Sequence, residues 1–118
     1  MFPSGAWRGY WEQTMWGRQP MRGLTLRFDS GRIDGDGDDI IGPFTFAGTY
    51  DDAGAVTLVK QYVGRHDVLY HGAYDGEGSI IGRWSISTLW SGPFALAPVL
   101  GGMEADAAVE VAAIGVGS

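Results

Sequence analysis

Cysteine is absent from this chain of 118 residues. Neither a disulfide framework nor a thiolate metal site is therefore available, and the fold must depend on packing. Long hydrophobic runs are also missing, because no segment approaches the ~18 uninterrupted apolar residues of a membrane-spanning helix. The first residues, 1–5, lack the basic region and apolar run of a signal peptide. The sequence predicts a soluble protein, cytoplasmic by default.

Positive charge is scarce. Lysine and arginine number 8 against 14 acidic residues, which gives a formal net charge of −6. A negative chain is repelled by the phosphate backbone of nucleic acid and by anionic membrane surfaces. We therefore expect no nucleic-acid partner and no membrane partner. No motif indicates a cofactor, and the sequence leaves self-association open.

Helical periodicity is missing before residue 100, and a β pattern takes its place. The 20 glycines separate short runs rich in aromatic and β-branched residues, at intervals of roughly 8 to 12 residues. Apolar and polar residues alternate within these runs, as in Leu24, Leu26 and Phe28 against Thr25 and Arg27. Strands are predicted near residues 7–16, 21–29, 31–36, 42–50, 54–63, 66–74, 79–88 and 92–97. The pattern predicts an all-β fold, a single up-and-down antiparallel meander barrel of about eight strands, because closure removes exposed sheet edges.

Two segments, residues 48–54 and 72–78, share the pattern Gly-x-Tyr-Asp-x-x-Gly. An aspartate side chain accepts hydrogen bonds from turn amides, and glycine adopts positive φ without a steric penalty. Both segments are therefore predicted to be hairpin tips.

Residues 1–118 are expected to form one β-barrel domain, but the composition changes to Ala, Glu and Val after residue 101. Residues 103–113 fit a short helix, whereas the alternation over 107–114 slightly favours a terminal strand. A flexible tail over 101–118 is the third alternative.

Several segments resemble known barrel families. Gly5-Ala6-Trp7 resembles the Gly-x-Trp that opens the first strand of lipocalins. The stretches 46–50, 70–75 and 81–90 are similar to the Gly-Thr-Tyr, Gly-x-Tyr and Gly-Trp…Trp rhythm of avidin and streptavidin, over roughly the middle half of the chain. The resemblance implies a calycin-type barrel with a cavity open at one end. It does not extend to biotin, because residues 7–14 hold no evident counterpart of the Asn and Ser that bind the ureido group in avidins.

The segment 56–72 carries the centre of the candidate ligand site. Its even-numbered residues include Lys60, Tyr62, His66 and Tyr70, which share one face if the strand register continues across Gly64. A cation, an imidazole and two phenols among apolar neighbours are the composition of a ligand pocket. If residues 64–67 are instead a turn, the register breaks, and Lys60, His66 and Tyr70 are then ordinary solvent-facing strand residues.

Three aromatic residues on other strands complete the predicted site: Phe44, Phe46 and Trp84. Trp84 is the preferred tryptophan because its strand alternates cleanly and Gly82 leaves room beside it. The leading hypothesis is a protein that binds a small apolar or aromatic molecule inside the barrel, with Lys60 and His66 among the residues that orient it. One alternative is an enzyme in which His66 or Lys60 performs acid–base chemistry on a small organic substrate. The other is a protein-interaction module with a filled core.

Metal binding is not predicted. Residues 34–39 begin like a calcium loop, but Asp39 stands where an EF-hand requires glycine and Thr45 where it requires a bidentate glutamate. We therefore expect an acidic hairpin loop there. His66 and His71 are separated by five positions, which places them on opposite faces of a continuous strand. No serine has the setting of a hydrolase nucleophile.

Overall fold

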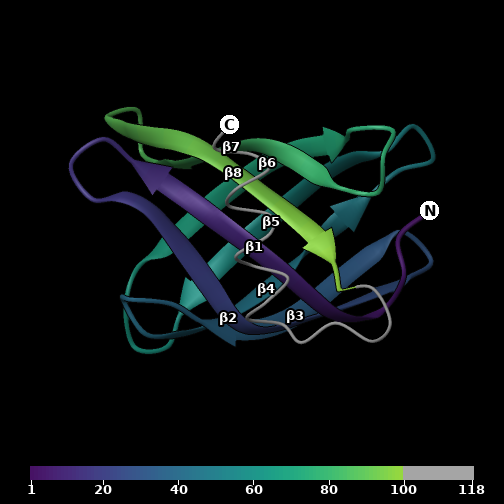
Figure 1. The fold of residues 1–118 in the computed structure, drawn as a ribbon, viewed down its shortest axis with the longest axis horizontal. Helices are drawn as coiled ribbons and strands as arrows, with labels where there is room; N and C mark the ends of the chain where they lie inside the picture. Colours follow the sequence, from purple (N-terminus) through teal and green to yellow (C-terminus); the bar gives the residue numbers. More distant parts are fainter. Residues whose placement is uncertain (100–118) are drawn as a thin grey trace.

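The computed structural model describes residues 1–99, which form a closed barrel of eight antiparallel strands (Figure 1). The strands are β1 (Gly5–Gln13), β2 (Gly17–Asp29), β3 (Arg32–Asp38), β4 (Pro43–Tyr50), β5 (Ala55–Tyr62), β6 (Asp67–Tyr74), β7 (Ile80–Ile86) and β8 (Trp90–Pro98). Residues 1–99 form no helix, and hence no helix that is long and apolar enough to cross a membrane. The predicted terminal strand or helix within 101–118 lies outside the described residues.

Each strand pairs with its neighbours in sequence, and β1 closes the barrel by pairing with β8. In that last ladder, Trp7 lies opposite Pro98 and Trp11 lies opposite Phe94. All eight ladders are antiparallel, so short turns suffice to connect the strands. The predicted all-β meander barrel is confirmed.

Two boundaries differ from the sequence prediction. The first strand ends at Gln13 rather than near residue 16, because the Gln13 side chain accepts hydrogen bonds from the backbone N–H groups of Met15 and Trp16 and closes a turn. The expected acidic hairpin loop is wrong for residues 34–38, which belong to β3. Asp34 is exposed on this strand and forms an ion pair with Arg27 of β2. Cross-strand charge pairs therefore keep these acidic residues in a regular ladder.

The barrel interior is filled by side chains that alternate along the strands. On β5, Val56, Leu58, Lys60 and Tyr62 are buried, while every intervening residue is exposed. The same alternation places apolar residues of all eight strands inside. The core includes Trp7, Trp11, Leu24, Leu26, Ile33, Phe44, Phe46, Leu58, Tyr70, Ile80, Trp84, Phe94 and Leu96.

The two predicted hairpin tips are confirmed. Asp51 accepts hydrogen bonds from the N–H groups of Ala53 and Ala55, each 2.9 Å long. Asp75 accepts the equivalent bonds from residues 77 and 79, at 2.7 and 3.0 Å. Gly54 and Gly78 adopt φ values of 91° and 100°, which a side chain would strain. Both tips lie at the same end of the barrel, the end where β1 begins.

This end, which we call the closed end, is plugged by the N-terminal segment. The Phe2 ring contacts the rings of Trp7, Phe28, Tyr50 and Tyr74, with centroid distances between 5.1 and 6.3 Å. Figure 1 shows the N-terminus at the right, opposite the turn that joins β1 to β2 at the left. The other end, where the turns after β1, β3, β5 and β7 lie, is the open end.

Candidate functional site

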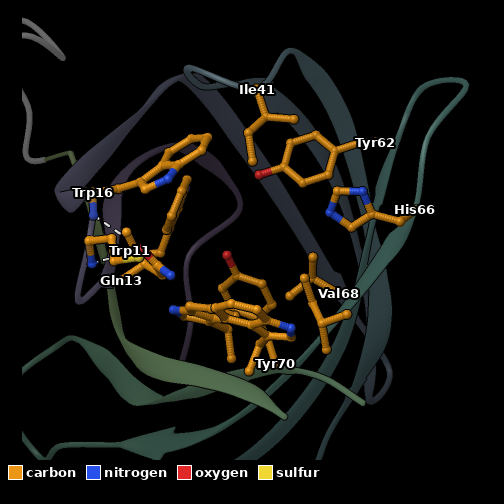
Figure 2. Close-up of a pocket in the computed structure, with 12 residues that line it drawn as sticks. Trp11, Gln13, Trp16, Ile41, Tyr62, His66, Val68 and Tyr70 are labelled. Carbon is orange, nitrogen blue, oxygen red and sulfur yellow. Dashed lines mark hydrogen bonds between the residues drawn. The ribbon is translucent and has the colours of Figure 1, made fainter.

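A cavity of about 280 Å³ occupies the open end of the barrel (Figure 2). Figure 2 shows Trp11, Tyr62, Val68 and Tyr70 around its centre, with Trp16 and Ile41 nearer the turns. Its wall is almost entirely apolar, and most of its large side chains are aromatic. The lining residues are Trp11, Gln13, Met15, Trp16, Ile41, Tyr62, His66, Val68, Tyr70, Trp84, Ile86 and Trp90.

Two tryptophans, from the strands β1 and β7 that flank β8, form one wall. The rings of Trp11 and Trp84 meet edge to face, with centroids 6.1 Å apart. The Trp84 indole N–H donates to the Glu12 carbonyl at 2.8 Å, which fixes the ring orientation. Room for this ring comes from Gly92, its cross-strand partner, because a Cβ on Gly92 would lie 2.7 Å from the indole nitrogen. The expectation that Gly82 supplies this room is wrong, since Gly82 abuts the backbone of His71 and Gly72.

The floor beneath the cavity contains a buried ion pair. Lys60 and Asp39 have fully buried side chains, and Lys60 Nζ lies 2.6 Å from Asp39 Oδ2. Lys60 comes from β5, whereas Asp39 follows β3 and turns inward at the start of the loop to β4. The N–H of Ile41 donates to Asp39 Oδ1 at 2.9 Å, so this inward turn is held by its own backbone.

Cavity-lining side chains are bonded directly to this pair. The Tyr62 hydroxyl donates to Asp39 Oδ2 at 2.7 Å, and the Trp11 indole N–H donates to the same oxygen at 3.0 Å. Lys60 Nζ donates to the Tyr70 hydroxyl oxygen at 3.3 Å. The positions of three aromatic rings in the cavity are therefore set by one buried charge pair. Each of these side chains has at least one hydrogen-bond partner within the network.

Aromatic rings also enclose the ammonium group of Lys60. Its Nζ lies 4.2 Å from the ring centroid of Phe44 and 4.8 Å from that of Tyr62. The rings of Tyr70, Trp11 and Phe46 follow at 5.5, 5.7 and 6.0 Å. Ring faces attract a cation, so they offset part of the hydration that the ammonium loses on burial.

Burial and pairing act together on the titration of the ion pair. Burial lowers the pKa of Lys60 to about 8, although Asp39 opposes this shift. Burial alone would raise the pKa of Asp39, but the Lys60 charge and the hydrogen bonds from Lys60, Tyr62 and Ile41 outweigh it, so the pKa is lowered. Near neutral pH the two groups are therefore an ammonium and a carboxylate of opposite charge.

The two tyrosines of the wall stay protonated. Burial raises the pKa of Tyr62 far above its ordinary value, and the adjacent Asp39 raises it further. Burial likewise raises the pKa of Tyr70. Within residues 1–99, the Tyr70 hydroxyl accepts from Lys60 while its own proton has no hydrogen-bond acceptor. Figure 2 shows this hydroxyl pointing toward the centre of the cavity.

Four of the seven predicted site residues line the cavity: Tyr62, His66, Tyr70 and Trp84. His66 belongs to the turn between β5 and β6, so the register does break there, yet its ring lies 5.3 Å from that of Tyr62 at the cavity mouth. The other three, Phe44, Phe46 and Lys60, are buried beneath the cavity and do not line it. The ligand contacts predicted for all seven remain predictions.

Sequence reasoning missed Asp39 as a site residue. It stands last in the run of alternating aspartates over 34–39, which reads as a solvated acidic segment. The one available signal was Ile40-Ile41 directly after it, because an apolar pair beside an acidic run indicates that the chain turns toward the core. Trp11, Trp16 and Trp90 were also left out of the predicted site, although all three line the cavity.

The described residues contain no cluster of three or more His, Asp or Glu side chains that could hold a metal ion. No protein-family model matches the chain, and no curated protein matches it by sequence.

Proposed function

We propose that this protein binds a small, neutral, apolar or aromatic molecule in the cavity at the open end of a calycin-type barrel. One observation carries the proposal: an aromatic cavity of about 280 Å³ remains at one end of a barrel that is otherwise filled. A dry apolar cavity of about 150 Å³ is large enough for benzene. The cavity here accordingly suits a molecule of about two fused rings.

The electrostatics of the site favour a ligand without charge. Asp39 neutralises Lys60, and both lie beneath the cavity wall with fully buried side chains. An anionic or cationic ligand would lose its hydration without gaining a counter-charge in the wall. Lys60 therefore acts through Tyr70: it occupies the acceptor side of that hydroxyl and leaves the proton available for a ligand oxygen. The preferred ligand is an aromatic molecule with one carbonyl or similar acceptor.

The sequence resemblance supports the calycin assignment. Trp7, of the Gly-x-Trp segment, is buried at the closed end near the start of β1. The meander of eight strands and the single open end also match what the resemblance implies. We do not advance the enzyme alternative, because Lys60 is enclosed by rings and bonded to Asp39.

Occupation of the cavity is tested with a neutral aromatic fluorophore, N-phenyl-1-naphthylamine. We expect saturable binding, read from probe fluorescence and from quenching of tryptophan emission, since four tryptophans line the cavity: Trp11, Trp16, Trp84 and Trp90. Val68 is buried in the wall, so Val68→Phe fills the cavity and should weaken binding at least about tenfold. Leu69→Phe is the matched control, because Leu69 lies next to it on β6 but faces outward. Equal affinities for the two variants would contradict the proposal.

The proposed role of Tyr70 is tested with a pair of ligands that differ in one acceptor, 2-acetylnaphthalene and 2-ethylnaphthalene. Removal of the hydroxyl in Tyr70→Phe should weaken binding of the ketone about tenfold, because one hydrogen bond in a dry site is lost. Binding of the hydrocarbon should stay within about twofold. A similar change for both ligands would show that Tyr70 contributes only shape.

A further inference from the structure

The turns of the open end carry a ring of exposed hydrophobic side chains, which we call the apolar rim. Every one of the four turns contributes at least one such residue, and their side chains are between 51% and 84% exposed. The apolar rim consists of Met15, Trp16, Ile40, Val63 and Leu89 of the turns together with Trp90, the first residue of β8. Monomeric proteins rarely gather exposed apolar residues at one end unless that end meets another apolar surface.

Exposed acidic residues are concentrated in the turns of the closed end rather than in those of the open end. The turns at the open end, residues 14–16, 39–42, 63–66 and 87–89, contain no exposed acidic residue, since Asp39 is buried. Their one exposed formal charge is that of Arg65. At the closed end, Asp51 and Asp52 occupy one turn, and Asp75 and Glu77 occupy another. The net charge of −6 therefore disfavours binding of the chain to an anionic surface. Little of that charge lies at the apolar rim.

Acidic residues near the rim sit at strand ends, and two of the three are paired. Glu12 lies 2.6 Å from Arg18, and Asp38 lies 3.4 Å from Arg22. The third, Asp67, is the first residue of β6. The negative charge of the molecule is thus weighted toward the closed end, and the open end carries little net charge.

We propose that the apolar rim docks on the surface of a lipid layer whose headgroups carry no net charge. A folded protein partner would require a complementary surface and about ten hydrogen bonds in an interface of ordinary size. Separate hydrophobic turn tips offer few of those hydrogen bonds, whereas a lipid layer requires none. Trp16 and Trp90 are half-exposed, and tryptophan is the side chain that favours the boundary between headgroups and hydrocarbon.

The apolar rim and the cavity share three residues, so docking on lipid would bring the cavity mouth to the lipid layer. Met15, Trp16 and Trp90 belong to the apolar rim and also line the cavity. A neutral aromatic molecule dissolved in lipid would reach the cavity along these side chains without crossing water. The docking itself rests on the rim and the charge distribution, and it stands whether or not the cavity holds a ligand.

Flotation of the protein with phosphatidylcholine vesicles tests the proposal. We expect the wild type to float with the vesicles, and we expect dibrominated phosphatidylcholine to quench its tryptophan emission through Trp16 and Trp90. Addition of phosphatidylserine should weaken the binding, because the chain carries a net charge of −6. The double variant Val63→Ser/Leu89→Ser should lower vesicle affinity at least about tenfold. Neither residue lines the cavity, so binding of N-phenyl-1-naphthylamine in solution should not change.

The matched control is Val59→Ser/Leu69→Ser, which makes the same two substitutions on the outer barrel wall, where these residues are 40% and 37% exposed. It should bind vesicles like the wild type. Absence of wild-type binding, or an equal loss in both double variants, would overturn the proposal. So would concentration-dependent self-association that only the rim variant abolishes, because the rim would then face a second copy of the chain.

Discussion

The two ends of the barrel are built from the same eight alternating strands, yet one is filled and the other is open. At the closed end, the N-terminal segment is held by bonds from Trp7 Nε1 to the Pro3 carbonyl and from the Phe28 N–H to Ser4 Oγ, each 2.8 Å long. These bonds place Phe2 among four aromatic rings. At the open end no described segment covers the cavity in this way, and the floor is formed by Lys60 and Asp39. In this barrel the difference between the two ends thus lies in the N-terminal segment, which fills the closed end and has no counterpart among the described residues at the open end.

The largest expected effect comes from breaking the floor. Lys60→Met leaves Asp39 buried without its counter-charge, so we expect a loss of about 3–5 kcal/mol in the free energy of unfolding. Urea denaturation followed by tryptophan fluorescence measures it. The double variant Lys60→Met/Asp39→Asn should recover part of the loss, because the amide still accepts from Tyr62 and Trp11 without carrying charge. A loss below about 1 kcal/mol for the single variant would contradict a buried ion pair.

The plug at the closed end gives the next effect. Phe2→Ala removes a buried ring that contacts Trp7, Phe28, Tyr50 and Tyr74, and should cost about 3 kcal/mol. Affinity for N-phenyl-1-naphthylamine should be unchanged in the folded protein, since none of these residues lines the cavity. A binding defect in a variant that remains folded would show that the two ends are coupled.

The free energy of unfolding should also depend on pH, because Lys60 beneath the cavity titrates with a shifted pKa. The pKa of Lys60 is about 8 in the fold against 10.5 ordinarily, so the unfolded chain binds more protons between these values and stability rises with pH there. The rise falls between about pH 7 and about pH 9.5, because loss of the proton removes the cost of burying the ammonium while the neutral amine still donates to Asp39. Above about pH 10 the gain reverses, because Tyr62 and Tyr70 ionise only in the unfolded chain. Urea denaturation across this range measures the curve, and Lys60→Met should remove the rise.

At acidic pH, the change in stability is expected to come from protonation of Asp39 rather than from Lys60. The pKa of Asp39 is lowered in the fold, so its contribution is present above its ordinary pKa of 3.8 and is lost as the pH falls through the lowered value. Asp39→Asn should therefore lose less stability than the wild type when denaturation at about pH 5 is compared with denaturation at about pH 2. Parallel losses in the two proteins would assign acid unfolding to other carboxylates.

The smallest change in stability is expected at the mouth of the cavity. Trp16 is half-exposed and lines the cavity, so Trp16→Ala should alter the free energy of unfolding by less than about 1 kcal/mol. Its affinity for N-phenyl-1-naphthylamine should nevertheless fall by about threefold to tenfold, because one wall of the mouth is removed. Calorimetry of unfolding and probe titration together separate the two effects. A large loss of stability would mean that the open end is as tightly packed as the closed one.

Local sequence patterns predicted the fold well. Glycine-separated runs rich in aromatic and β-branched residues located all eight strands, and the pattern Gly-x-Tyr-Asp-x-x-Gly located two turns whose aspartates make the expected bonds. Such features depend on neighbours within a few residues.

The candidate site was only partly predictable. Tyr62 and Tyr70 reach the cavity as their positions on β5 and β6 indicate, but His66 reaches it from a turn.

The sequence by itself determined the alternation of the strands, the chemistry of the turns and the absence of any thiol from the core. Only the tertiary structure decided that Asp39 leaves an acidic run to meet Lys60, 21 positions further along the chain. It also decided that Phe2 fills one end while the other keeps a cavity. The physical reason is that backbone periodicity is a local property, whereas the pairing of a buried charge and the filling of a space depend on side chains that only closure of the barrel brings together.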